Sequence, residues 1–167
     1  MQIDSLKKLY INELQDVFSA ENQILEALPK LVKEASSKEL KNALNEHLEV
    51  TKKQVGRLNE IFKNMNEKPS TMVCKGMQGI IQEGDQTVSS TKDPEVKDAC
   101  IIAAAQRVEH YEISVYGTLR TYAEIIGDED ARDILQSTLE EEKETDKKLT
   151  ELAVNSINVE ASKKGNM

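Results

Sequence analysis

Apolar residues recur every three or four positions over long stretches of this chain, which is the spacing of one face of an α-helix. Two such stripes predict helices at about residues 5–33 and 36–64. Two more predict helices at about residues 94–126 and 128–156. The pattern therefore predicts an all-α protein built around four long helices.

Local signals mark several of the expected helix ends. Ser36 and Glu39 fit a capping box at the start of the second helix. Asp93 fits the N-cap of the third helix and Pro94 its first position, while Gly127 is its expected C-terminal stop. The aspartate after Gly127 can cap the fourth helix. These signals favour two helical hairpins, which close near residues 35 and 127.

Residues 65–93 interrupt the helical pattern. Proline and glycine punctuate the segment at Pro69, Gly76, Gly79 and Gly84. A short extra helix within it is indicated by Met72, Met77, Ile80 and Ile81. The segment is too long for an ordinary bundle loop, so we expect it to carry the chain from one end of the bundle to the other. Two hairpins joined by such a crossover have the plan of a ferritin-like four-helix up-down bundle.

Glutamates occupy positions in these stripes where the helical pattern calls for apolar residues. Glu21, Glu112 and Glu142 each lie near the centre of a stripe, given a rotation of about 100° per residue. A lone buried carboxylate is costly unless it is neutralised, paired or bound to a metal ion. Glu112 and Glu142 lie at one depth in their hairpin, and Glu21 lies level with the stretch between His47 and Thr51. The sequence therefore predicts one polar layer that receives side chains from four helices.

The residue types in this layer suit a metal site. Glu109 and Asp146 lie within one helical turn of it. Carboxylates and imidazole suit Fe, Mn or Zn, and two cations would neutralise a cluster that otherwise repels itself. Any single glutamate can instead be a boundary residue that reaches solvent, or an ion-pair partner across a dimer interface. Agreement of angle and depth across both hairpins favours the metal site.

Other candidate residues have simpler interpretations. Tyr111 and Tyr116 are interpreted as packing aromatics, with hydrogen-bond donors or radical sites beside the ions as the alternative. His110 points away from its stripe and is interpreted as a supporting or interface residue rather than a ligand. Cys100 lies in an apolar run typical of a core. Cys74 lies in the irregular segment, where a redox-reactive thiol is the less favoured interpretation.

Length and charge narrow the class of protein. The 167 residues suit one domain, which we place at residues 1–160, with a flexible C-terminal tail at 161–167. A net charge of −8 argues against binding to a phosphate backbone, so no nucleic acid is expected as a partner. No apolar run reaches the ~18 residues of a membrane span, so no membrane is expected either. Without an apolar export signal, we expect a cytoplasmic protein with reduced cysteines.

The chain resembles the YciE/YciF family of bacterial ferritin-like stress proteins. One stretch in each expected helix carries the resemblance: DVFSAENQILEALPKL, EHLEVTKKQVGRL, IIAAAQRVEHYEISVYGTL and LEEEKETDKKLTELA. The crossover adds MVCKGMQGIIQEG. The combination of RVEHYEISVYG with LEEEK is the most specific part, because generic helical composition does not produce it. The resemblance covers nearly the whole chain.

The resemblance implies a ferritin-like bundle with an extra short helix, a homodimer, a two-metal site and a link to bacterial stress responses. Carried over by motif, the metal ligands are Glu21, His47, Glu109, Glu112, Glu142 and Asp146. Better-known di-iron bundles carry a Glu-x-x-His pair on each of two helices, and this chain has no such pair on an inner face. The implied site is therefore rich in carboxylate and poor in imidazole.

Three functional hypotheses follow. The leading one is a dinuclear metal centre, of iron or else of manganese or zinc, that serves in coping with oxidative or related stress. If the centre is redox-active, the expected reaction is Fe(II) oxidation by O2 or peroxide. The alternative is a non-catalytic helical dimer with a structural or interaction role and no functional metal site. A cage-forming, DNA-binding mini-ferritin is the third, which the acidic charge and the absence of a long basic tail disfavour.

Overall fold

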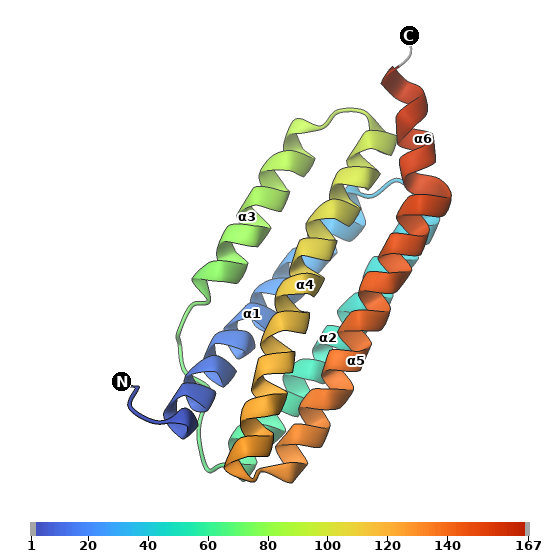
Figure 1. Cartoon of the computed structure of the whole chain (residues 1–167). Coiled ribbons are helices and arrows are strands. Elements are labelled where there is room, and N and C mark those ends of the chain that lie inside the picture. The colour runs from blue at the N-terminus through green and yellow to red at the C-terminus, as the bar shows by residue number, and fades with distance from the viewer. Residues whose placement is uncertain (1–2, 166–167) are drawn as a thin grey trace.

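The computed structural model describes residues 3–165, and all regular secondary structure in that range is helical (Figure 1). The all-α prediction is therefore confirmed. Among the described residues, no helix is both long and apolar enough to cross a membrane. The helices are α1 (Leu6–Glu34), α2 (Lys38–Asn64), α3 (Lys75–Ser90), α4 (Pro94–Ile126), α5 (Glu129–Leu152) and α6 (Asn158–Ser162).

Two helical hairpins lie side by side and form a bundle. α1 and α2 are joined by residues 35–37 and pack against each other, as do α4 and α5, which are joined by residues 127–128. α1 also contacts α4, and α2 contacts α5, so each long helix has two neighbours around a common interior. In Figure 1 the chain runs up α1, down α2, down α4 and up α5.

Residues 65–93 return the chain from one end of the bundle to the other, as expected (Figure 1). They include α3, which has 16 residues and is longer than the short helix that the sequence predicted. α3 lies against α1 and α4 on the outside of the bundle, where Met77 and Val88 are buried. Gly84 permits close approach, because a Cβ at this position would lie 3.0 Å from the Cβ of Ala104.

Most of the predicted caps are in place, with one error. Asp93 accepts hydrogen bonds from two N–H groups in the first turn of α4, and Gly127 ends α4 with a left-handed φ of 79°. The capping box at Ser36 is wrong by one residue, because Ser37 is the N-cap of α2. Ser36 instead hydrogen-bonds to the carboxylate of Asp98, a buried residue of α4.

The last helix extends further than the sequence predicted. Beyond α5 the chain forms a π-helical segment, Ala153–Ile157, and then α6. Ile157 is buried against the bundle, and Lys164 reaches the carboxylate of Glu95 at 3.1 Å, so packing and charge hold this end in place. Of the tail expected at 161–167, residues 161–165 are helical, and residues 166–167 lie outside the described residues.

The buried apolar side chains form two clusters, with a polar layer between them. The cluster beside the α1–α2 loop includes Ile24, Leu28, Leu40, Leu44, Ile101 and Leu149. The cluster beside the α4–α5 loop includes Tyr10, Leu14, Leu58, Phe62, Leu119 and Leu135. Each long helix contributes to both clusters and crosses the polar layer near its middle.

Candidate metal centre

Side chains from all four long helices make the polar layer. Glu21 comes from α1, His47 from α2, Glu109 and Glu112 from α4, and Glu142 from α5, and all five side chains are buried. They face inward because each occupies a position in the apolar stripe of its helix. The structure therefore brings five of the six expected ligands to one depth in the bundle.

Four of these side chains converge closely. One potential ligand atom from each of His47, Glu109, Glu112 and Glu142 lies within 4.8 Å of the others. Nδ1 of His47 lies 3.2 Å from Oε1 of Glu109. Atoms that share one metal ion at about 2 Å are themselves roughly 3–4 Å apart, so this spacing fits coordination with little movement.

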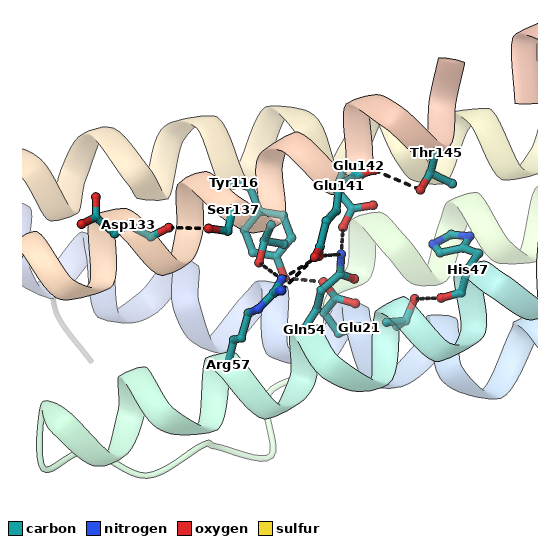
Figure 2. Close-up of polar contacts among 12 residues, drawn as sticks. Glu21, His47, Gln54, Arg57, Tyr116, Asp133, Ser137, Glu141, Glu142 and Thr145 are labelled. Atoms are coloured by element: carbon teal, nitrogen blue, oxygen red, sulfur yellow. Dashed lines mark hydrogen bonds and ion pairs between the residues drawn. The ribbon is translucent and has the colours of Figure 1, made fainter. Parts of the chain in front are cut away.

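Glu21 borders this group from α1. Its Oε1 accepts a hydrogen bond from the hydroxyl of Tyr116, and its Oε2 has no partner among the described residues (Figure 2). The interpretation of Tyr116 as a packing aromatic is therefore incomplete. The ring is buried in the second apolar cluster, but the hydroxyl orients a carboxylate of the polar layer.

The layer has few hydrogen-bond donors. Within residues 3–165, both carboxylate oxygens of Glu109 and of Glu112 lack a hydrogen-bond partner, as do both ring nitrogens of His47. One oxygen of Glu142 is also unpaired, and so is the amide oxygen of Gln54. Buried polar atoms are nearly always paired, so this many unpaired acceptors in one place need an explanation. Bound cations provide one, because they take lone pairs and bring no competing acceptor. Protonation provides another, because a protonated carboxyl donates to its neighbour, and the raised pKa values of Glu109 and Glu112 favour that form.

Burial favours the neutral form of every titratable group in the layer. Desolvation, with nearby carboxylates adding to it, raises the pKa of Glu21 to about 7 and that of Glu142 to about 8. The same causes raise the pKa values of Glu109 and Glu112 well above the usual range. Desolvation lowers the pKa of His47 to about 4. His47 is thus neutral at physiological pH, which is the form that binds metals.

Polar residues that the sequence analysis missed support the layer. The amide nitrogen of Gln54 donates to Oε1 of Glu142 and, at 3.2 Å, to Glu141 (Figure 2). Arg57 holds Glu141 through two hydrogen bonds of 2.6 and 2.8 Å, and this partly exposed pair lies between the layer and solvent. The available signal for Gln54 was its position seven residues after His47, two turns along the same helix face.

Asp146, the sixth expected ligand, is not part of the converging group. Its Oδ1 accepts a hydrogen bond of 3.0 Å from Gln106 and lies 3.4 Å from Nε2 of His110. His110 is exposed, and it contacts an expected ligand rather than the group itself. Burial and Glu142 contribute most to the raised pKa of Glu109, but the charge of Asp146 adds to it. Asp146 therefore lies at the edge of the layer.

Cys74 is buried, and its thiol takes part in hydrogen bonds that hold the start of α3 in place. Its Sγ accepts a hydrogen bond from the N–H of Met77 at the start of α3 and lies 3.0 Å from the hydroxyl of Tyr111. That hydroxyl donates to Asp16 at 2.6 Å, so Tyr111 joins α4 to α1 and to α3. Burial raises the pKa of the Cys74 thiol, which disfavours the reactive thiolate. This environment favours the structural interpretation of Cys74.

A family model described as a domain of unknown function, DUF892, matches residues 5–162. The chain belongs to the DUF892 family. Protein YciF of Escherichia coli (strain K12) is 44% identical to it over 165 residues, which cover 98% of this chain and 99% of that protein. The family resemblance that the helix motifs indicated is therefore confirmed.

Solved structures share the fold of this DUF892 chain. The E. coli stress protein YciF matches with a TM-score of 0.90 at 44% identity, over 93% of this chain and 99% of that one. YcfI from Rhodopseudomonas palustris, described provisionally as a structural protein, matches with a TM-score of 0.87 at 42% identity. The match covers 89% of this chain and 95% of that one. A protein from Xanthomonas campestris shares the fold at 20% identity, with a TM-score of 0.72 over 94% and 98% of the two chains.

Proposed function

We propose that this DUF892 protein is a ferritin-like four-helix bundle that binds a carboxylate-rich dinuclear metal centre. Iron is the leading metal, with manganese and zinc as alternatives, and the protein would serve in the response to oxidative or related stress. One observation carries the proposal: His47, Glu109, Glu112 and Glu142 converge in an apolar interior, and each has an unpaired potential ligand atom among the described residues. The description of the E. coli relative as a stress protein supports the cellular role.

Charge balance favours two cations over one. Glu21, Glu109, Glu112 and Glu142 would together carry four negative charges when ionised, and the neutral His47 adds none. Two divalent cations balance this charge, whereas one leaves two charges uncompensated in an interior where each costs several kcal/mol. Carboxylate oxygens with one imidazole nitrogen suit Fe(II) and Mn(II), and also Zn(II).

The residues of the layer have separable roles in this proposal. Glu112 and Glu142 would be central or bridging ligands, and Glu21, Glu109 and His47 would be terminal ones. Tyr116 donates a hydrogen bond to one oxygen of Glu21, and Gln54 donates one to an oxygen of Glu142. Each hydrogen bond fixes the direction of the other oxygen of that carboxylate. Asp146 is proposed as a ligand or supporting acceptor at the edge. With iron bound, the chemistry that the centre would supply is the oxidation of Fe(II) to Fe(III), with O2 or peroxide as the electron acceptor.

Metal analysis tests the proposal. After anaerobic reconstitution with Fe(II) or Mn(II) and removal of free metal, the protein should retain about two equivalents per chain, as in dinuclear sites. The variant Glu112→Gln/Glu142→Gln keeps the side-chain size and removes two charges, so it should retain little or none. Glu60→Gln/Glu144→Gln is the matched control, because both residues are exposed, on α2 and α5, and the variant loses the same charge. An unsubstituted protein that retains no metal would overturn the proposal.

Diffraction on either side of the iron absorption edge supplies the direct observation. Two anomalous peaks within reach of the layer would identify the ligands, and the six expected residues could then be assigned individually. Peaks bound only to exposed carboxylates would count against the centre even if the bulk analysis found metal.

A structural role is the second candidate, favoured by the description of the R. palustris relative. In that case the layer would be held by protonated carboxylates, and the metal analysis would find no retained ions. A homodimer belongs to both candidates and stays a prediction. Light scattering of the purified protein would distinguish a dimer from a monomer and from a cage of many subunits.

A further inference from the structure

An apolar pocket lies between α1, α3 and α4, where α3 covers the side of the bundle. Its volume is about 30 Å³. Aliphatic side chains form most of its wall, among them Ile24, Leu28, Ile80, Ile81, Ala104 and Val108. The polar lining residues are His47 and Asp85. The pocket therefore connects a largely aliphatic wall with His47, a proposed ligand of the metal centre.

The size and lining of this pocket suit a small apolar molecule. One water molecule needs roughly 10–15 Å³ by this measure, and it also needs two to four polar partners. The pocket exceeds that size, but it offers two polar side chains on a wall that is otherwise aliphatic. Cavities lined by aliphatic side chains stay dry and take up apolar guests, and most of this wall is aliphatic.

The pocket adjoins the surface on one side and the polar layer on the other. Ala27, Ile81 and Asp85 line both the pocket and an open groove between α1 and α3. His47 lines the pocket and also a second groove, between α2 and α5, whose lining includes Glu46. Two approaches of different polarity thus meet at the imidazole of His47, which has no hydrogen-bond partner within residues 3–165.

We propose that the pocket under α3 is a binding and entry site for dioxygen, from which it reaches the metal centre at His47. The inference rests on the proposed function and adds the route of the oxidant. Dioxygen is uncharged and apolar, so an apolar cavity favours it over water and over ions. The crossover helix then has a role of its own, because Ile80, Ile81 and Gly84 on α3 form the outer wall.

Xenon is the probe for this site, because it binds dry apolar cavities and needs no metal. Crystals of the metal-free full chain under xenon pressure should show a xenon peak between α1, α3 and α4. Ala27→Leu places a larger side chain at the mouth of the pocket and should abolish this peak. Ile81→Phe blocks the same mouth from α3, and it serves if the first variant does not fold. Ala103→Leu, on the exposed face of α4, is the matched control and should keep the peak.

The same variants, loaded with Fe(II), report on delivery. Variants without the xenon peak should oxidise Fe(II) more slowly than the unsubstituted protein when dioxygen is limiting. They should keep their metal content and their rate of Fe(II) oxidation by hydrogen peroxide. Absence of xenon from the unsubstituted protein would overturn the proposal that the pocket binds a gas. An unchanged rate of Fe(II) oxidation by dioxygen in a variant with a blocked pocket would overturn the proposal that the pocket delivers dioxygen. If the unsubstituted protein bound xenon but no metal, the proposed function would fail and the delivery with it, while the gas site would stand.

Discussion

Buried carboxylates in this protein occur in two contrasting environments. Asp98 is buried on α4, and its oxygens accept hydrogen bonds from the backbone N–H groups of Ser36 and Ser37 and from the Ser36 hydroxyl, at 2.6–2.8 Å. Glu109 and Glu112 are equally buried on the same helix and have no such donors among the described residues. The first arrangement is complete in the protein alone and ties the α1–α2 loop to α4. The second is satisfied by protonation of the carboxyls or by bound cations.

The substitution Asp98→Ala should therefore destabilise the fold. It leaves two backbone N–H groups near the α1–α2 loop without acceptors, and we expect the free energy of unfolding to fall by about 3 kcal/mol. Urea denaturation measures this. Glu144→Ala, at an exposed position of α5, should change it by less than about 0.5 kcal/mol. Equal effects of the two substitutions would contradict the structural role of Asp98.

At the residue scale, periodicity predicted which side chains point inward but not their partners. Glu21, Glu112 and Glu142 were found because a charged residue in an apolar stripe is conspicuous. Gln54 is less conspicuous, and its importance depends on Glu142, which lies 88 residues away in the chain. Such a contact is decided by how the hairpins pack, which no local pattern encodes.

At the scale of the elements, short-range signals fixed most helix ends. Asp93 and Gly127 bound α4 because an N-cap and a left-handed stop need only a few neighbouring residues. The length of α3 and the continuation past Ser156 were underestimated. Glycines interrupt the sequence of α3, and polar residues dominate the chain beyond Ile157. Both segments pack against other helices, as the burial of Met77 and Ile157 shows.

Gly117 within α4 and Gly127 directly after it should respond oppositely to substitution by alanine. Gly127 has a φ of 79°, so Gly127→Ala should lower the free energy of unfolding by about 1 kcal/mol through backbone strain. Gly117 lies inside the helix with nothing within 4 Å of an added Cβ, so Gly117→Ala should raise it by up to about 1 kcal/mol. Thermal or urea denaturation of both variants measures the difference. Effects of the same sign would contradict this assignment of the end of α4.

At the scale of the whole molecule, the order of the hairpins and the crossover followed from element lengths and from one long irregular segment. The exact position of α3 did not, because its contacts with α1 and α4 depend on small residues such as Gly84 and Ala104. The depth of the polar layer was predictable since antiparallel helices joined by a short loop pair at equal distances from that loop. Which carboxylates converge most closely was decided by packing.

The polar layer also makes the stability of the metal-free protein depend on pH. The pKa values of Glu21 and Glu142 are raised from 4.5 to about 7 and about 8, so the stability is greatest below pH 4.5 as far as these groups are concerned, and it falls as the pH rises from there to the raised values. His47, with a pKa lowered to about 4, loses its contribution only as the pH falls below its ordinary value of 6.5. Above pH 6.5 the carboxylates alone should therefore set the slope.

We expect the free energy of unfolding of the metal-free protein to fall between about pH 6.5 and pH 8, by up to about 1.4 kcal/mol per pH unit for each proton released. Urea denaturation across this range measures the slope. Glu112→Gln/Glu142→Gln should flatten it, because two of the titrating groups are gone. Mn(II) should reverse it in the unsubstituted protein, since the metal binds the ionised ligands. A slope that is identical in both proteins would contradict the raised pKa values.

The separation of the interior into two apolar blocks has a consequence for protein engineering. Each block lies beside one interhelical loop, and apart from Tyr116, whose hydroxyl reaches Glu21, the residues that fill the blocks differ from those of the polar layer. Donor atoms at mid-height can thus be exchanged without repacking either end, and either end can be strengthened without disturbing the donors. A bundle of this kind is suited to the design of other cofactor sites in the polar layer between the two apolar clusters.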